Sequence, residues 1–260
     1  MKYSLIVPYY RTPEITRLAL HSMFHFAMGE PEVIVVDNAP GREESHMLEE
    51  FPKIRRLDNT TALTGSGANF EALDLGIAAA SHDHVGLVHS DSIFMQPGWD
   101  TTWFGYLDRQ NLSALGTFER EANPFRAFRK RVEDQFKHLV HRRRVEPGLP
   151  GKLAMHFLLT RRTDLQAAGF SFRRDRDLLS RQFDGVRNGV EVLSLREISG
   201  LMWHTSNITS LLTGQMTEPR LIRSYKLKRR RFLADPFVKK HFAEVLPRVT
   251  AGPPPDGQRR

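Results

Sequence analysis

Short apolar runs alternate with helix-like stripes through the first third of the chain. Ser4–Val7 and Val33–Val36 are strand-like runs, because short β-branched stretches bounded by turn residues are typical of buried strands. Between them, an apolar stripe from Ile15 to Phe26 has helical spacing. Thr12 is expected to cap this helix, with Pro13 at its first position. Strand, helix and strand in this order predict a parallel pair.

The same alternation continues after the second strand. Ile54–Asn59 is expected to contain a third strand, and Val85–Val88 a fourth. Between them, the glycine-rich stretch Leu63–Asn69 leads into a helix that runs to Ala80. Backbone N–H groups at such a helix start can bind phosphate. The stretch is neither a Walker loop nor a full dinucleotide-binding pattern.

Further elements extend the alternation beyond the fourth strand. We expect a helix at Trp103–Leu107, strands at Ala114–Phe118, within Pro150–Arg162 and at Val190–Leu195, and a short helix at Thr163–Phe170 that ends at Gly169. The whole pattern predicts an α/β fold with a mostly parallel central sheet flanked by helices.

The charge pattern divides the chain further. We expect one domain over residues 1–210, with a charged helical insertion at about 119–150. A basic helical segment is expected at 211–250, and a disordered proline- and glycine-rich tail at 251–260.

The net charge and the lack of cysteine indicate which kinds of partner and which compartment suit the chain. The chain has 260 residues, a formal charge of +8 and no cysteine. The charge favours an anionic partner, such as nucleic acid, an anionic membrane or a phosphorylated ligand. The absence of cysteine fits a reducing compartment, and the apolar run at the N-terminus is too short for a signal peptide. These features predict a cytoplasmic protein.

Two carboxylates follow strand-like runs. Asp37 comes directly after Val36, and Asp91 ends the cluster His89-Ser90-Asp91 that follows Val88. Ligands of open α/β sheets bind beyond the carboxyl ends of the strands. Asp37 could therefore accept hydrogen bonds from a nucleoside, or it could merely form an Asx-turn. Asp91 could hold a hard cation, or its cluster could be a polar turn.

In order along the chain, several segments resemble the N-terminal half of family 2 glycosyltransferases. They are Ser4–Tyr10, Val33–Asp37, Gly65–Asn69, Val85–Asp91 and Pro97–Trp99. The family has a GT-A fold and binds a nucleotide-diphospho-sugar. Val88-His89-Ser90-Asp91 occupies the place of its Asp-x-Asp motif, so the resemblance implies that Asp91 contacts a metal. His89 stands where the family has its first Asp.

Two later segments extend the resemblance. Phe172–Arg181 looks like the family's second signature, with Asp175 on the carboxylate that serves as base and Arg174 where the family has Glu. His204 resembles a terminal His that completes the metal site. Without the resemblance, Asp175 and Asp177 would be read as a charged helix start, and His204 as an ordinary histidine.

The resemblance implies an inverting glycosyltransferase, a hexosyl- or related transferase of bacterial-type surface polysaccharide or glycolipid synthesis. Asp175 would be catalytic, and Mn²⁺ or Mg²⁺ would bind Asp91 and His204. The donor would be a nucleotide-diphospho-sugar, with a UDP-sugar favoured, and the acceptor a saccharide or a lipid-linked one. Residues implied in donor binding are Pro8, Tyr9, Tyr10, Asp37, Asn69, His89, Ser90 and Asp91.

Two departures from the family leave an alternative open. His89 is expected to weaken metal dependence or shift it towards Mn²⁺. Arg174 would lower the proton affinity of Asp175 and make it a weaker base. The alternative is a GT-A-like binding protein that has lost turnover and acts through basic surfaces. A nucleotidyltransferase is disfavoured because its glycine-rich and lysine signature near the N-terminus is missing.

A basic cluster lies beyond the resemblance. Lysines and arginines between Arg220 and Arg231 alternate with apolar residues, and no acid lies between Glu218 and Asp235. This pattern suits peripheral contact with the inner face of an anionic membrane, or a solvated helix. Nucleic acid is the least favoured of the three interpretations.

Overall fold

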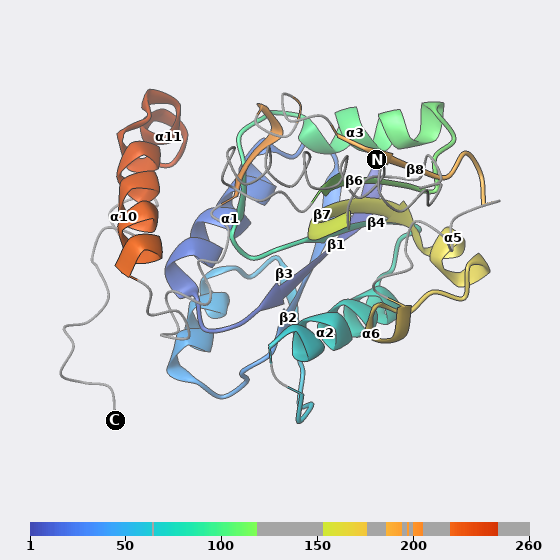
Figure 1. Ribbon diagram of the computed structural model, residues 1–260, viewed down its shortest axis with the longest axis horizontal. Coiled ribbons are helices and arrows are strands. Elements are labelled where there is room, and N and C mark those ends of the chain that lie inside the picture. The colour runs from blue at the N-terminus through green and yellow to red at the C-terminus, as the bar shows by residue number, and fades with distance from the viewer. Residues whose placement is uncertain are drawn as a thin grey trace, which may run out of the picture.

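The computed structural model describes residues 1–63, 65–118, 153–175, 186–193, 197, 200–204 and 219–243. In this part of the chain, a seven-stranded sheet has the order β3-β2-β1-β4-β7-β6-β8, and a two-stranded sheet pairs β5 with β9. Helices cover both faces of the large sheet (Figure 1).

Most strands of the large sheet run in one direction. β1, β2, β3 and β4 are parallel, while β7 is antiparallel to both β4 and β6, and β8 is parallel to β6. The expected mostly parallel sheet is therefore confirmed. The strands are β1 (Lys2–Tyr9), β2 (Glu30–Asp37), β3 (Ile54–Asp58), β4 (His84–Val88), β6 (Ala114–Phe118), β7 (Leu153–Arg161) and β8 (Val190–Val192).

Alternation along the central strands builds two cores. In β1, Leu5 and Val7 join the core beneath α1 and α3, while Ile6 joins the core beneath α2. Successive side chains of a strand point to opposite faces, so a strand covered on both sides is apolar throughout. The helices are α1 (Pro13–Phe26), the 3₁₀ helix η1 (Glu43–Glu50), α2 (Ser66–Ala79), α3 (Trp99–Arg109), α5 (Arg162–Ala167), α6 (Phe172–Asp175), α10 (Pro219–Ala234) and α11 (Pro236–His241).

The start of α1 differs from expectation in one respect. The helix begins at Pro13 as predicted, but Thr12 makes no capping hydrogen bond with its side chain. Its hydroxyl lies 3.3 Å from that of Thr16 instead. Thr12 is therefore the N-cap residue as predicted, but its side chain does not make the capping hydrogen bond, because the buried hydroxyl of Thr16 one turn away is a competing partner.

The small sheet was not anticipated as a sheet. It pairs β5 (Ser92–Phe94) antiparallel to β9 (Met202–His204). β5 lies against α1, where the Phe94 N–H donates to the Ser22 hydroxyl at 2.9 Å. This packing fixes the segment that directly follows Asp91.

Some predictions fall outside the described residues. They include the insertion at 119–150, the tail at 251–260, Asp177 and the proposed boundary at residue 210, which all stay predictions. Among the residues that the structure does describe, no helix is long and apolar enough to cross a membrane.

Candidate functional site

The carboxyl ends of three parallel strands form one edge. Tyr9 of β1 is in register with Asp37 of β2, which is in register with Asp58 of β3. Beyond this row, the Asn38 N–H donates to the Tyr9 carbonyl at 2.9 Å, and the Asn59 N–H to the Asp37 carbonyl at 2.8 Å. Polar side chains from three strands therefore converge where an open α/β sheet binds its ligands.

Asp37 is enclosed at this edge. Its side chain is fully buried, and its Oδ1 accepts a hydrogen bond from the Ala39 N–H at 2.9 Å. The Asx-turn considered for this residue is thus present. Arg56 Nη2 lies 3.0 Å from Oδ2, but this ion pair lacks hydrogen-bond alignment, so Oδ2 is left without an aligned donor. Asp37 Oδ2 can therefore still accept a hydrogen bond from a ligand.

The segment after β1 is held against η1. The Tyr9 hydroxyl donates to the Glu44 carbonyl at 2.6 Å, and Arg11 Nε donates to the Glu44 carboxylate at 2.9 Å. Burial, and then the charges of Asp37 and Glu44, raise the pKa of Tyr9 well above its ordinary value. Tyr9 therefore stays protonated. Pro8 is buried in β1, and Tyr10 is half-buried.

The glycine-rich segment packs onto the same edge. Gly65 has a φ of 58°, which favours glycine, and α2 begins at Ser66. Asn69 lies in the first turn, where its N–H donates to the Gly65 carbonyl at 3.3 Å. Asn59 Nδ2 joins the two parts, donating to Asn38 Oδ1 at 2.7 Å and to the Ala68 carbonyl at 3.3 Å.

Sequence reasoning did not single out Asn38, Asp58 or Asn59. Asp58 and Asn59 directly follow Ile54–Leu57, the core of the third expected strand. The rule that selected Asp37 and Asp91, a polar residue just beyond a strand, would have selected these two as well.

Asp91 lies beyond β4 in a tight turn. The Ser92 N–H donates to the His89 carbonyl at 3.0 Å, which closes the polar turn considered for this cluster. Ser90 and Asp91 are buried, whereas His89 is half-buried. His89 Nδ1 lies 3.9 Å from Asp91 Oδ1. The turn thus carries a buried carboxylate with an imidazole beside it.

The small sheet brings His204 to this turn. Ser92, the neighbour of Asp91 in sequence, is the register partner of His204. The backbone positions of both proposed metal ligands are therefore adjacent, while the side chain of His204 lies outside the described atoms. The described residues contain no cluster of three metal-ligating side chains. Mg²⁺ is usually bound by one or two carboxylates together with substrate phosphates, so Asp91 fits such an ion.

Helix α6 carries Asp175 as its last residue. Its first N–H groups meet Asp74 of α2, which accepts from the Phe172 N–H at 2.8 Å and the Arg173 N–H at 3.1 Å. The Ser171 hydroxyl donates to the same carboxylate at 2.7 Å. Asp74 therefore caps α6 and ties it to α2, a contact that no local pattern signals.

Arg174 points back along its own segment. Its Nη2 donates to the Gly169 carbonyl at 2.6 Å. The side chain of Asp175 lies outside the described atoms. The expected effect of Arg174 on the proton affinity of Asp175 therefore stays a prediction.

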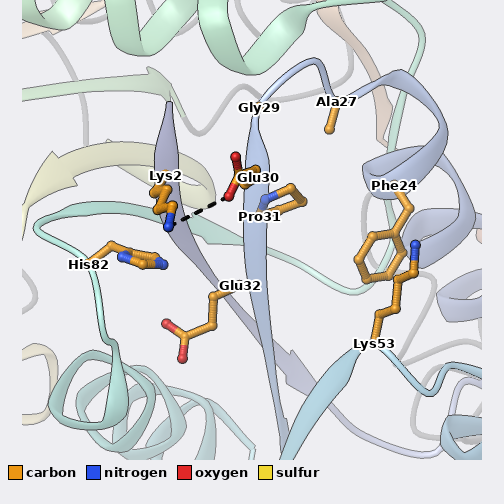
Figure 2. A pocket seen from close by; sticks show the side chains of 9 residues that line it. All are labelled: Lys2, Phe24, Ala27, Gly29, Glu30, Pro31, Glu32, Lys53 and His82. Carbon is orange, nitrogen blue, oxygen red and sulfur yellow. Dashed lines mark ion pairs between the residues drawn. The ribbon is translucent and has the colours of Figure 1, made fainter.

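A pocket of about 490 Å³ lies at the other end of β1 and β2. Figure 2 shows Lys2 reaching towards Glu30, with the two charged atoms 3.8 Å apart. Glu32, in the same pocket, accepts from the Ser4 hydroxyl at 2.6 Å. Because Lys2 and Glu30 begin their strands, this pocket is remote from the carboxyl edge, and none of the expected site residues line it.

Comparisons with known proteins agree with this architecture. The family model described as glycosyl transferase family 2 matches residues 4–177. TarS 1–349 of S. aureus in complex with UDP-GlcNAc is 17% identical and has a TM-score of 0.57, over 94% of this chain and 73% of that chain. No curated protein matches the chain.

A second solved structure has the same fold. The mannosyltransferase PcManGT of Pyrobaculum calidifontis, in complex with GDP-Man and Mn²⁺, is 16% identical with a TM-score of 0.52. The match covers 96% of this chain and 76% of that chain. At these identities the likeness concerns the fold alone, and the expected GT-A fold is confirmed.

Proposed function

The chain belongs to glycosyl transferase family 2, and we propose that it transfers a sugar from a nucleotide-diphospho-sugar to an acceptor hydroxyl. One observation carries the proposal: Asp91 lies beyond β4, next to the register partner of His204, at the edge where Asp37 also lies. The complexes of TarS with UDP-GlcNAc and of PcManGT with GDP-Man support a donor of this class.

The carboxyl ends of β1, β2 and β3, where Tyr9, Asp37 and Asp58 lie in register, would hold the nucleoside. Asp37 Oδ2 has no aligned donor in the described structure, so a base N–H or a ribose hydroxyl could complete its hydrogen bonding. Arg56 would first have to move away from this carboxylate. Its side chain is 31% exposed, which leaves it a route towards solvent. Pro8, Tyr9, Tyr10, Asn69, His89 and Ser90 are the other residues proposed to contact the donor.

The turn after β4 would hold the diphosphate. Asp91 and His204 would bind Mn²⁺ or Mg²⁺, which, when present, neutralises charge on the leaving diphosphate. Asp91 supplies the hard oxygen that such ions prefer. The Mn²⁺ in the PcManGT complex supports this choice of cofactor.

Asp175 would be the general base. It would take the proton from the acceptor hydroxyl while the acceptor oxygen bonds to the anomeric carbon. The nucleoside diphosphate would leave from the opposite face, so the sugar is transferred with inversion. Asp74 supports this role because it fixes the start of the short helix that ends at Asp175.

The acceptor would be a saccharide or a lipid-linked hydroxyl, and the transferred group a hexose or a related sugar. The proposed pathway is bacterial-type surface polysaccharide or glycolipid synthesis on the cytoplasmic side of a membrane. A UDP-sugar is the favoured donor.

A thermal-shift panel tests the donor class. UDP-, GDP-, dTDP- and CMP-sugars are each added with and without Mn²⁺. We expect one nucleotide series to raise the melting temperature, with a larger rise when Mn²⁺ is present, because a ligand that binds only the folded state stabilises it. No rise with any of the four series would overturn the proposal.

The alternative of a binding protein without turnover is supported by His89 and Arg174, the two departures from the family pattern. Free nucleoside diphosphate released from the donor separates the two functions. An enzyme releases it, whereas a binding protein is stabilised by the donor and releases none.

A further inference from the structure

The positive charge of the chain is concentrated in one segment. Residues 219–243 contain nine lysines and arginines against a single acid, Asp235, so their formal charge of +8 equals that of the whole chain. The remaining residues, taken together, are neutral. Asp235 is already used to begin α11, accepting from the Phe237 N–H at 2.8 Å.

Helix α11 attaches this segment to α1. Val238 and Phe242 are fully buried, and the ring of Phe237 stacks on that of Phe26 with centroids 5.6 Å apart. Leu233, near the end of α10, packs against the same core. Figure 1 shows α10 and α11 beside α1, at the side of the molecule away from α2 and α5.

The opposite side of α10 is exposed and cationic. The exposed side chains at helical spacing are Arg223, Lys226, Leu227, Arg230 and Arg231. Residues three or four apart lie on one face of a helix, so these five form one surface, here called the basic face. Leu227 lies within it and is 50% exposed. A cationic face with an exposed leucine among its charges is typical of helices that lie in a membrane interface.

We propose that the basic face of α10 binds the surface of an anionic phospholipid bilayer. Its cations would meet headgroup phosphates, and Leu227 would enter the boundary with the acyl chains. Nucleic acid is disfavoured because an exposed leucine in the centre of the face adds nothing to phosphate contacts, which depend on cations and polar groups. A merely solvated helix does not require seven lysines and arginines without one acid among them, as residues 219–234 have.

The position of the basic face agrees with a membrane-bound acceptor. α1 contacts α11 through Phe26 and contacts β5, the strand that follows Asp91, through Ser22, one helical turn away. One helix therefore connects the bilayer surface to the turn that carries Asp91. Binding to vesicles does not require turnover, so this inference is tested separately from the proposed transferase activity.

The test is co-sedimentation of the full chain with vesicles of phosphatidylcholine alone and with added anionic phosphatidylglycerol. We expect binding to the anionic vesicles only, weakening as salt rises. The triple variant Arg223→Glu, Lys226→Glu and Arg230→Glu should lower the affinity by about a hundredfold or more, at roughly fivefold for each cation lost. Leu227→Ser should lower the affinity several-fold, because the leucine side chain would lose its apolar contact with the boundary of the acyl chains.

The control carries the same charge change elsewhere. Arg42→Glu, Lys53→Glu and Arg109→Glu alter exposed cations of the main domain and should leave vesicle binding within about twofold of the parent chain. All positions are exposed, so circular dichroism should show folded variants. Equal losses in both triple variants would overturn the proposal, as would no binding to anionic vesicles. Binding to RNA that the basic-face variant loses but Leu227→Ser keeps, with no vesicle binding, would assign the face to nucleic acid instead.

Discussion

Ser92 and His204 are register partners in the antiparallel pair of β5 and β9. Because Ser92 directly follows Asp91, this pairing places an acid at the end of one strand beside a histidine from a distant part of the chain. The pairing therefore brings the backbone positions of the two proposed metal ligands together, although Asp91 and His204 are far apart in sequence.

The first prediction concerns the two proposed metal ligands. Asp91→Asn should remove the effect of Mn²⁺ on donor binding, because a neutral amide is a poor ligand for a hard cation. His204→Ala should weaken the same effect by more than about tenfold. Calorimetric titration of the donor, with and without Mn²⁺, measures both changes. A metal effect that persists at full size in Asp91→Asn would exclude Asp91 as a ligand.

The second prediction separates two roles of Asp37. Asp37→Asn keeps an oxygen for the Ala39 N–H, so the turn should form, but it loses the charge that Arg56 pairs with. Nucleotide affinity should fall about tenfold or more with little loss of stability, since a hydrogen bond to a charged group contributes about 1.5–3 kcal/mol. Arg56→Gln is the matched control.

Arg56→Gln leaves the Asp37 charge buried and should destabilise the fold by about 1–3 kcal/mol. Its carboxylate nevertheless remains available to a nucleotide. If both variants lose stability equally and neither loses nucleotide affinity, Asp37 serves only the turn. Chemical denaturation and nucleotide titration of the two proteins give the comparison.

The third prediction concerns the cap of α6. Asp74→Ala removes the acceptor of two backbone N–H groups and should cost about 1 kcal/mol of stability. The proposed base Asp175 would then be less well placed, so kcat should fall while the donor KM stays near that of the parent. Asp74→Asn, which keeps an acceptor oxygen, should recover most of the loss. Unchanged kcat in Asp74→Ala would show that α6 does not position the base.

The fourth prediction is a pH dependence at the junction of α11 with α1. Burial, then the positive charge of Lys240 and the neighbouring His25, lower the pKa of His241. His25 Nε2 lies 3.3 Å from His241 Nδ1, and His21 Nε2 lies 3.4 Å from the His241 carbonyl. The folded state therefore binds protons less readily here than the unfolded chain does.

It follows that this stabilisation is complete above the ordinary histidine pKa of about 6.5 and is lost as the pH falls below it. The protection factors of the α11 amides, which remove the intrinsic pH dependence of exchange, should fall as the pH drops below about 6.5, while those of α2 change little. In His241→Phe, which keeps an aromatic ring against Phe26 and Phe237, this fall in protection should shrink. An unchanged fall in that variant would assign the effect to another group.

The central strands could be predicted because their signal is local. β1, β2 and β4 each contain a short apolar run, Leu5–Val7, Val33–Val36 and Val85–Val88 respectively, so both the sheet and the edge that carries Asp37 and Asp91 follow from the sequence. β5 could not be predicted, since it has three residues and exists through pairing with β9. The cap on α6 depends on Asp74, which is far away along the chain. The Thr12 hydroxyl lies against that of Thr16 and does not accept from a backbone N–H at the start of α1.

Departures from the family pattern are the part of the site that sequence could locate but not interpret. In the structure, His89 Nδ1 lies 3.9 Å from Asp91 Oδ1, and Arg174 Nη2 donates to the Gly169 carbonyl. Neither arrangement follows from spacing, because each depends on how a turn directs its side chains.

The central claim is tested most directly by the release of nucleoside diphosphate from a nucleotide-sugar, measured for the parent chain and for Asp175→Asn side by side. We predict that the parent releases it in the presence of an acceptor and Mn²⁺, and that Asp175→Asn binds the same donor with unchanged affinity but releases almost none. Release by Asp175→Asn at the rate of the parent, or no release by the parent from any of the four donor series, would contradict the account.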